Sequence, residues 1–380
     1  MSTPLTMAKK ATKSKSKATK PAARRGFGAS PTKIGNVDLV NDPESLNFMT
    51  WLQEGGASIG KVALATNLRG VPGLRGMVAT QTIEAGEAIV SIPRDLCIYL
   101  GSDAENPGFA GAELARIKND PGRAAKFQPY LTVLPKGDGL DNTIFFPPED
   151  LALCEWAPVI GETEEKMQRL RATLEGLNKN VGRARGAIDS AGAAGPGPMD
   201  APQDGHSSQV MSWDDFAWGV YQVESRVFTI FEEGMGRKFA CPVIDMMNHD
   251  GKSTNVLKPT RDGWVQVIAG KRLRPGQELC IVYADGAANM DKILVEYGFV
   301  DEGNENDVAQ LITKTTLSGQ TGLGLDLAGV RAALDRFSTT DDEDLAQLRE
   351  ASSRFAATAI RFRIAKKKSL RQALQQLETA

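Results

Sequence analysis

Two strand-like stretches stand on either side of a long helical region, and this order most constrains how the chain can fold. The first, GMVATQTIEAGEAIVSIP at residues 76–93, predicts two β segments around a turn at residues 84–86, closed by Pro93. The second, WVQVIAGKRLRPGQELCIVY at residues 264–283, predicts a β pair around a Pro-Gly turn. Each places a Gly and a Glu between two strand-like runs. The strands therefore flank a helical insert and precede a helical tail.

Helical signals begin before the first strands and dominate the insert. NFMTWLQEGG, residues 47–56, predicts a short helix ended by glycine. Residues 109–180 read as mainly helical. Within them one apolar set recurs at helical spacing and predicts a stripe that faces a core: Met167, Leu170, Leu174 and Leu177.

A further helix is predicted from Ser212, which stands three residues before Asp215, the spacing of a capping box. The stretch SWDDFAWGVYQVESRVFTIFEE places apolar residues at 216, 220, 223, 227 and 231, on one helical face. Its polar stripe, which spacing alone reads as a solvated face, contains Gln222, Ser225 and Thr229. Beyond about residue 304 the chain is mostly helical, with a capping box expected from Thr340 to Glu343.

Two segments lack the side chains that build a core. MSTPLTMAKKATKSKSKATKPAARRGFGAS contains no acidic residue, so we expect a disordered basic arm over residues 1–41. A solvated tail, an organellar transit peptide and a nuclear-targeting or polyanion-binding tail share this composition. Residues 183–208 are rich in Gly, Ala, Pro and Ser and predict a linker, which leaves His206 exposed and without a role.

Composition excludes several classes of protein. The 45 basic and 47 acidic residues give a net charge of −2, so nothing favours nucleic acid or a membrane surface. The four cysteines have no CxxC spacing, which argues against a zinc knuckle or a disulfide framework and favours a reducing compartment. No apolar run approaches the roughly 20 residues that span a bilayer. We expect a folded protein that is neither secreted nor embedded in a membrane.

The segment CPVIDMMNHD, residues 241–250, contains several residue types that occur in catalytic and metal-binding sites: Cys, Asp, Asn and His. A catalytic zinc would need several His or Cys ligands, and His249 is one of only two histidines. A hydrolase would need a nucleophile elbow, and no GxSxG occurs. GGASIGKV at residues 55–62 is not a phosphate loop, because Val62 replaces the required Ser or Thr. Taken alone, the Asp-x-x-Asn-His pattern is usually a turn with satisfied side-chain hydrogen bonds.

The order of motifs resembles that of the SET-domain protein methyltransferases. GLRGMVA at residues 73–79 is followed by IEAGEAIVSIP, Ser225-Arg226, the Asp-Met-Met-Asn-His run, GQELCIVY and YGF at residues 297–299. This order is similar to the subgroup that contains the Rubisco large-subunit lysine methyltransferase, over roughly residues 45–305. The resemblance implies an α+β fold: a SET β-fold of several small sheets with a pseudoknot, split by a helical insert and followed by a helical C-terminal domain.

The resemblance also implies a division of the chain. It places the first SET half at residues 42–101, the helical insert with its linker at 102–211, the second SET half at 212–303 and a helical substrate-binding region at 304–380.

The methyl donor S-adenosylmethionine would lie, by resemblance, between the Gly-rich and Asn-His segments. Residues implied to contact the donor are Gly73, Arg75, Met77, Ser225, Arg226, Asn248, His249 and Tyr297. Glycine there would let the backbone approach a ligand closely. Residues implied to contact the acceptor side chain are Ser225, Arg226, Asp245 and Tyr297, and the catalytic residue would be Tyr283.

The expected reaction is methyl transfer to a lysine amine of a protein substrate, without a metal or nucleic acid and with the enzyme as a monomer. Two alternatives stay open: a histidine acceptor on the same fold, and an inactive SET-fold binding module. The basic arm is compatible with a chloroplast location, as a transit peptide, and equally with a cytoplasmic or nuclear location.

Overall fold

The computed structural model describes residues 32–102, 106–191, 210–232, 234–260, 262–286, 288–314 and 322–379. His206 and most of the predicted basic arm and linker lie outside these residues. The expectation of an arm up to residue 41 was wrong at its end, because residues 33–39 form a small hairpin. Val37 and Leu39 of this hairpin pack against Ala65 and Val78, and this contact gives the hairpin apolar surface to bury.

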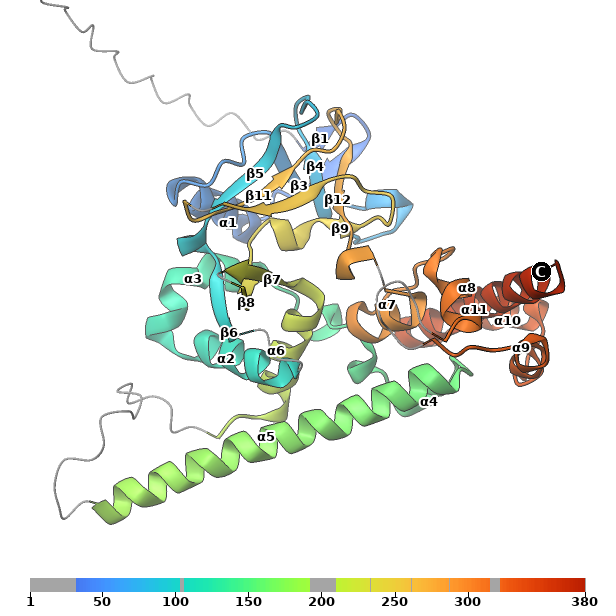
Figure 1. The fold of residues 1–380 in the computed structure, drawn as a ribbon. Helices are drawn as coiled ribbons and strands as arrows, with labels where there is room; N and C mark the ends of the chain where they lie inside the picture. The colour runs from blue at the N-terminus through green and yellow to red at the C-terminus, as the bar shows by residue number, and fades with distance from the viewer. Residues whose placement is uncertain are drawn as a thin grey trace, which may run out of the picture. The chain divides into compact units, whose positions relative to one another are not determined.

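The strands form three small sheets (Figure 1). The six-stranded sheet has the order β1 (Lys33–Ile34), β2 (Val37–Leu39), β3 (Val62–Thr66), β4 (Gly76–Ala79), β12 (Glu278–Ile281) and β9 (Asn248–His249). The second sheet has the order β10 (Val256–Pro259), β11 (Trp264–Ile268) and β5 (Ala88–Pro93). The third has the order β6 (Ile98–Ser102), β8 (Met235–Ala240) and β7 (Val227–Glu232).

The two strand-like stretches that flank the insert pair with each other. β4 pairs antiparallel with β12, and β5 pairs antiparallel with β11. Their turns also meet, because Ile83 and Leu273 exchange backbone hydrogen bonds of 3.1 and 2.8 Å. The expected β pair within residues 264–283 is therefore wrong: its two strands lie in different sheets. Each turn is too long for a tight hairpin. Each stretch therefore forms an arch, and the two strands of one arch pair with the two strands of the other.

The helices are α1 (Pro43–Glu54), α2 (Pro107–Asn119), α3 (Pro121–Val133), α4 (Pro148–Ala152), α5 (Ala157–Ala191), α6 (Trp213–Arg226), α7 (Met290–Tyr297), α8 (Asn306–Ile312), α9 (Leu327–Leu334), α10 (Asp341–Arg349) and α11 (Arg354–Thr379). Predicted helix starts are confirmed at Ser212, whose side chain accepts from the Asp215 amide, and at Thr340, which forms a capping box with Glu343. α1 ends at Gly55 as expected. The predicted apolar stripe of α5 packs on Phe216 and Val220 of α6.

The helix predicted from Ser212 is shorter than its apolar pattern suggested. It ends at Arg226, and residues 227–232 form strand β7. The run VFTIFE is β-branched and aromatic, and its register with β8 supplies ladder hydrogen bonds that a longer helix would lose. The expectation of a solvated polar stripe also fails at Gln222, which is 1% exposed and donates to the carbonyl of Pro135.

Helix α5 runs nine residues into the predicted linker, from residue 183 to Ala191. The sequence RARGAIDSA there contains several good helix formers, Ala and Arg, so a helix already begun continues through it. Figure 1 shows α5 as one uninterrupted helix.

The C-terminal helices have their own core, and α11 brings basic side chains into it. Arg363 and Lys367 both pair with Asp344 of α10, at 2.8 and 2.7 Å, and all three side chains are at most 3% exposed. Lys366 pairs with Asp291 of α7. These buried ion pairs fix α11 against α7 and α10, because a buried charge is tolerated only where it is paired.

Candidate active site

A parallel ladder brings the Asn-His segment to the end of a buried strand. β9 pairs with β12 in the register Cys280↔Asn248 and Ile281↔His249. Just beyond the ladder, the amide of Tyr283 donates to Nδ1 of His249 at 3.0 Å. The segments that the sequence placed 34 residues apart therefore form one side of a single site.

Four rings gather at this point. The ring of Tyr283 lies 4.8 Å from that of Tyr297, 5.2 Å from that of His249 and 6.4 Å from that of Phe299. Tyr297 and Phe299 come from the end of α7 and the residue after Gly298, whose positive φ of 77° ends the helix. The YGF turn is thus the element that carries both rings to Tyr283.

The Tyr283 hydroxyl is held as a hydrogen-bond donor. It donates to the carbonyl of Met247 at 2.8 Å. Burial raises the pKa of the Tyr283 phenol well above its ordinary value, and the guanidinium of Arg226 opposes this only in part. Because the phenolate is disfavoured, Tyr283 can orient a partner but is a poor general base.

Asn248 ties the Gly-rich segment to the ladder. Its Nδ2 donates to the carbonyl of Arg75 at 2.9 Å and to Glu278 at 2.8 Å. A Cβ at Gly76 would lie 2.5 Å from that nitrogen, so a larger residue there would displace the Asn248 side chain. Gly73, in the same loop, has a positive φ of 76°, and its amide donates to the side chain of Asn67.

Two of the predicted donor residues point elsewhere with their side chains. Arg75 donates to the Ser45 hydroxyl of α1 at 3.0 Å, and burial lowers its pKa. Met77 is fully buried in the main core. The backbone carbonyl of Arg75 accepts from Asn248, and Met77 lies within the sheet between Leu64 and Leu279.

A second group of predicted residues meets beneath the rings. Arg226 donates to the carbonyl of Asp245 at 3.0 Å, and its guanidinium lies 3.8 Å from that carboxylate. Burial raises the pKa of the Asp245 carboxyl to about 6, against the opposing effects of Arg226 and of the hydrogen bond from Tyr130. One carboxylate oxygen of Asp245 and Nε of Arg226 are buried without a hydrogen-bond partner among the described residues. Such atoms are what a polar ligand group would satisfy.

The Ser225 hydroxyl is not directed to this group. It donates to the carbonyl of Tyr221, one turn earlier in α6, at 2.7 Å. Ser225 is therefore placed near the site by its backbone, as the neighbour of Arg226.

Three residues of this region were not singled out from the sequence. The Tyr130 hydroxyl of α3 donates to Asp245 at 2.7 Å. Arg69 donates to the carbonyl of His249 at 3.0 Å and pairs with Glu278 at 2.7 Å. Nothing local marks Tyr130, which is 115 residues from its partner. Glu278 lies inside the quoted run GQELCIVY, and Arg69 lies four residues before GLRGMVA, so a closer reading of these motifs would have included both.

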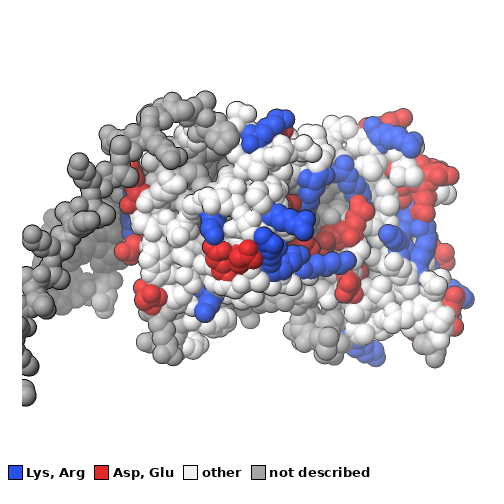
Figure 2. Space-filling view, turned by 90° about the horizontal axis from the view of Figure 1, so that it is seen from above, with Lys and Arg blue, Asp and Glu red and all other residues white. Residues whose placement is uncertain are grey.

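Charged side chains of both signs lie on the surface of the molecule, and those of the described residues form no metal-binding cluster. Figure 2 shows Lys and Arg side chains intermingled with Asp and Glu on the face it presents. Within the described ranges, no group of three or more His, Cys, Asp or Glu side chains could hold a metal ion. In the same ranges, no helix combines the length and the apolar character needed to cross a membrane. Two hollows of about 530 and 590 Å³ lie elsewhere, and no predicted site residue lines either.

Comparison with known proteins shows the family and the fold of the chain. The model of the SET domain family matches residues 74–284, more than half of the 380 residues. Among solved structures, the SET domain of LSMT bound to lysine and AdoHcy matches with a TM-score of 0.61 and 15% identity, over 89% of this chain and 91% of that one. Rubisco LSMT bound to AdoMet matches with a TM-score of 0.60 and 15% identity, over 89% and 92%. No curated protein sequence matches the chain.

A third solved structure, Rubisco LSMT bound to sinefungin and monomethyllysine, matches with a TM-score of 0.62 and 15% identity, over 89% and 92%. At this identity the likeness establishes the fold: a SET β-fold of small sheets with a helical insert and C-terminal helices.

Proposed function

Because the chain belongs to the SET-domain family, we propose that it is an S-adenosylmethionine-dependent protein methyltransferase whose acceptor is a lysine side-chain amine. The observation that carries the proposal is the position of Tyr283. It joins the Asn248–His249 strand through a hydrogen bond and faces Tyr297 across 4.8 Å.

The Gly-rich and Asn-His segments fit a donor of this kind. Gly76 has no Cβ that would displace Asn248, and Asn248 donates to the Arg75 carbonyl, so the backbone of residues 73–76 lies close to β9. Gly73, Arg75, Asn248 and His249 would hold the donor, with Arg69 fixing the His249 carbonyl. When bound, the donor supplies an electrophilic methyl group on a sulfonium. The solved structures of Rubisco LSMT with AdoMet and AdoHcy support this choice of donor.

The acceptor amine must lose its proton before it can attack. A lysine side chain in water has a pKa of about 10.4, so its deprotonation at pH 7 costs roughly 4.6 kcal/mol. Tyr283 is a poor base because of its raised pKa, so the proton would leave to solvent as burial lowers the pKa of the lysine. The Tyr283 hydroxyl and the carbonyls beside it would then orient the neutral amine.

Asp245 and Arg226 would line the acceptor side of the site. Their unpartnered polar atoms are buried next to Tyr130, where an entering side chain could meet them. Tyr297 would form the aromatic wall opposite Tyr283. The helical region 304–380 would contact the rest of the protein substrate, a role that rests on the family resemblance.

The test is incubation of the purified protein with labelled donor and cell extract, followed by mass spectrometry of the labelled proteins. Methyl-lysine on a protein that Tyr283→Phe fails to label is the expected result. Methyl-histidine instead would replace the lysine acceptor by the histidine alternative. Failure of the purified protein to bind the donor in calorimetry would favour an inactive binding module.

A further inference from the structure

Cys97 and Cys241 lie opposite each other where β6 and β8 meet the main core. β6 and β8 pair antiparallel in the register Ile98↔Ala240 and Tyr99↔Phe239, and the next pair in this register is Cys97 and Cys241. Directly opposed residues of an antiparallel pair have Cα atoms about 4.5 to 5.5 Å apart, within the range of disulfides. Both cysteines are free.

Each thiol donates to a backbone carbonyl at 3.8 Å, Cys97 to Pro93 and Cys241 to Phe239. A hydrogen bond with Cys97, followed by burial, holds the pKa of the Cys241 thiol well above its ordinary value. Cys241 is fully buried, whereas Cys97 is 5% exposed. Both cysteines are buried, and Cys97 is the less deeply buried of the two.

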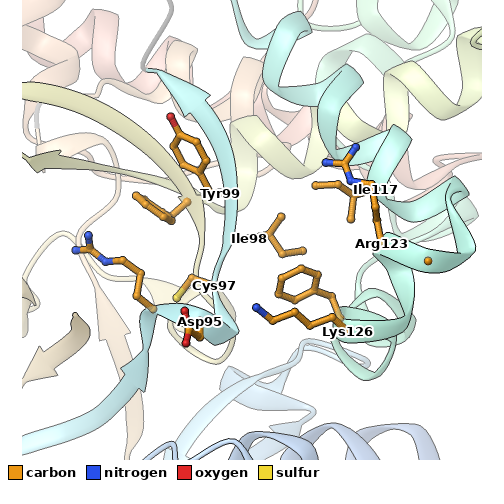
Figure 3. A pocket seen from close by; sticks show the side chains of 11 residues that line it. Asp95, Cys97, Ile98, Tyr99, Ile117, Arg123 and Lys126 are labelled. Atoms are coloured by element: carbon orange, nitrogen blue, oxygen red, sulfur yellow. The ribbon is translucent and has the colours of Figure 1, made fainter. Parts of the chain in front are cut away.

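A hollow of about 530 Å³ lies beside the pair (Figure 3). Cys97 lines it, and Figure 3 shows Asp95, Cys97 and Lys126 at the same end. Its lining carries three cationic side chains, Arg94, Arg123 and Lys126, and the carboxylate of Asp95. Arg123 is paired with Glu113, outside the lining, so the excess positive charge comes from Arg94 and Lys126. This balance favours an anionic visitor.

We propose that Cys97 and Cys241 are a redox modification site, oxidised to a disulfide by a small anionic disulfide that enters the hollow. The Cys97 thiolate attacks one sulfur of the visitor, forms a mixed disulfide and releases one thiol. The Cys241 thiolate then attacks the Cys97 sulfur and releases the second thiol. The two cysteines lose two protons and two electrons, and the visiting disulfide is reduced to two thiols.

Oxidation would disturb the candidate active site. An S–S bond of about 2.0 Å requires both sulfur atoms to leave the backbone carbonyls of Pro93 and Phe239 to which the thiols now donate, and it joins the start of β6 covalently to the end of β8. The Cys241 carbonyl accepts from the Asp245 amide at 3.0 Å, and Asp245 contacts Arg226. A shift of about 1 Å near a reacting group can lower turnover by roughly a hundredfold. This consequence rests on the proposed methyl transfer, whereas the disulfide does not.

The experiment treats the folded full chain with glutathione disulfide, alkylates the remaining thiols and maps the products by mass spectrometry. Wild type should give a peptide pair joined through Cys97 and Cys241. Cys241→Ala should stop at a stable glutathione adduct on Cys97, because no second thiol is present. Cys97→Ala should give neither product, and the control Cys154→Ala should behave as wild type. Cystamine, a cationic disulfide, should react more slowly.

Several results would overturn the proposal. They are the absence of the cross-link in folded wild type, faster modification of Cys154 or Cys280 than of Cys97, and equal rates with cystamine. Oxidised protein that transfers methyl groups as fast as reduced protein would remove the link to the site. If the reduced protein transfers no methyl group, the proposed function fails while the mapped disulfide still stands.

Discussion

The backbone amide of Tyr283 donates a 3.0 Å hydrogen bond to Nδ1 of His249. This bond links the residue that the resemblance marks as catalytic to the segment that it marks as donor-binding. It also requires Nδ1 of His249 to be an acceptor, so any proton on the neutral ring sits on Nε2, which lies 3.5 Å from Asp301. The hydrogen bond to His249 contributes to lowering the pKa of Asp301.

Tyr283→Phe should reduce methyl transfer by roughly a hundredfold or more while leaving donor affinity within about twofold. The phenyl ring keeps the packing against Tyr297, and only the hydroxyl that orients the amine is lost. Turnover with labelled donor and calorimetry with unlabelled donor measure the two quantities. Tyr99→Phe, a change at a half-exposed tyrosine of β6, is the matched control. Wild-type turnover in Tyr283→Phe would exclude this tyrosine from the mechanism.

Gly76→Ala should weaken donor binding roughly tenfold, which corresponds to about 1.4 kcal/mol. The added Cβ would lie 2.5 Å from Nδ2 of Asn248 and push it from its two acceptors. Gly60→Ala is the control, since a Cβ at Gly60 meets nothing within 4 Å and Gly60 has no positive φ. Calorimetry gives both affinities, and thermal unfolding checks that the two variants are folded. Equal affinities would show that the close approach at Gly76 does not serve the donor.

Asp245→Asn should change the pH dependence of stability. The folded pKa of Asp245, about 6, exceeds the unfolded value, so the folded state binds this proton more tightly. The stability from that proton is present below about pH 4 and is lost as the pH rises through 6. The free energy of unfolding of Asp245→Asn minus that of wild type should therefore grow by about 1 kcal/mol between pH 5 and 8.

Urea unfolding at several pH values measures this difference in the free energy of unfolding. Loss of the carboxylate beside Arg226 adds the same amount at every pH, so it does not affect the change with pH. Asp341→Asn should give a flat difference over the same range, because its ion pair with Arg371 lowers the pKa of Asp341. A flat profile for Asp245→Asn would mean that this carboxyl does not titrate near pH 6.

Asp344→Asn should destabilise the protein by about 3 kcal/mol, because it leaves buried Lys367 without its carboxylate partner and removes one of the two carboxylate partners of buried Arg363, which also pairs with Glu155. Asp344 accepts from Arg363 and Lys367 and is fully buried. Asp341→Asn removes a pair with Arg371 that is about half exposed, and it should cost less than about 1 kcal/mol. Chemical unfolding compares the two. Similar losses of stability in the two variants would contradict the view that burial determines how much an ion pair contributes to the free energy of unfolding.

Signals close together in the sequence predicted their structures well. The caps at Ser212 and Thr340 and the glycine stop at Gly55 each involve groups a few residues apart, and each is confirmed. The order of motifs likewise indicated the family, because it depends on sequence alone. The same local reading failed where a distant partner competed. Residues 227–232 have a helical apolar spacing, yet pairing with β8 makes them a strand.

The sequence by itself determined several of the strands and helices, the helix starts at Ser212 and Thr340, and which residues belong to the family motifs. Only the tertiary structure decided that the two arches pair with each other, that Tyr130 holds Asp245, and that Cys97 faces Cys241. These contacts join residues far apart in the chain. Packing of the apolar strands buries backbone and side-chain polar groups, and each buried polar group must then bond to a partner that the packing has brought close to it.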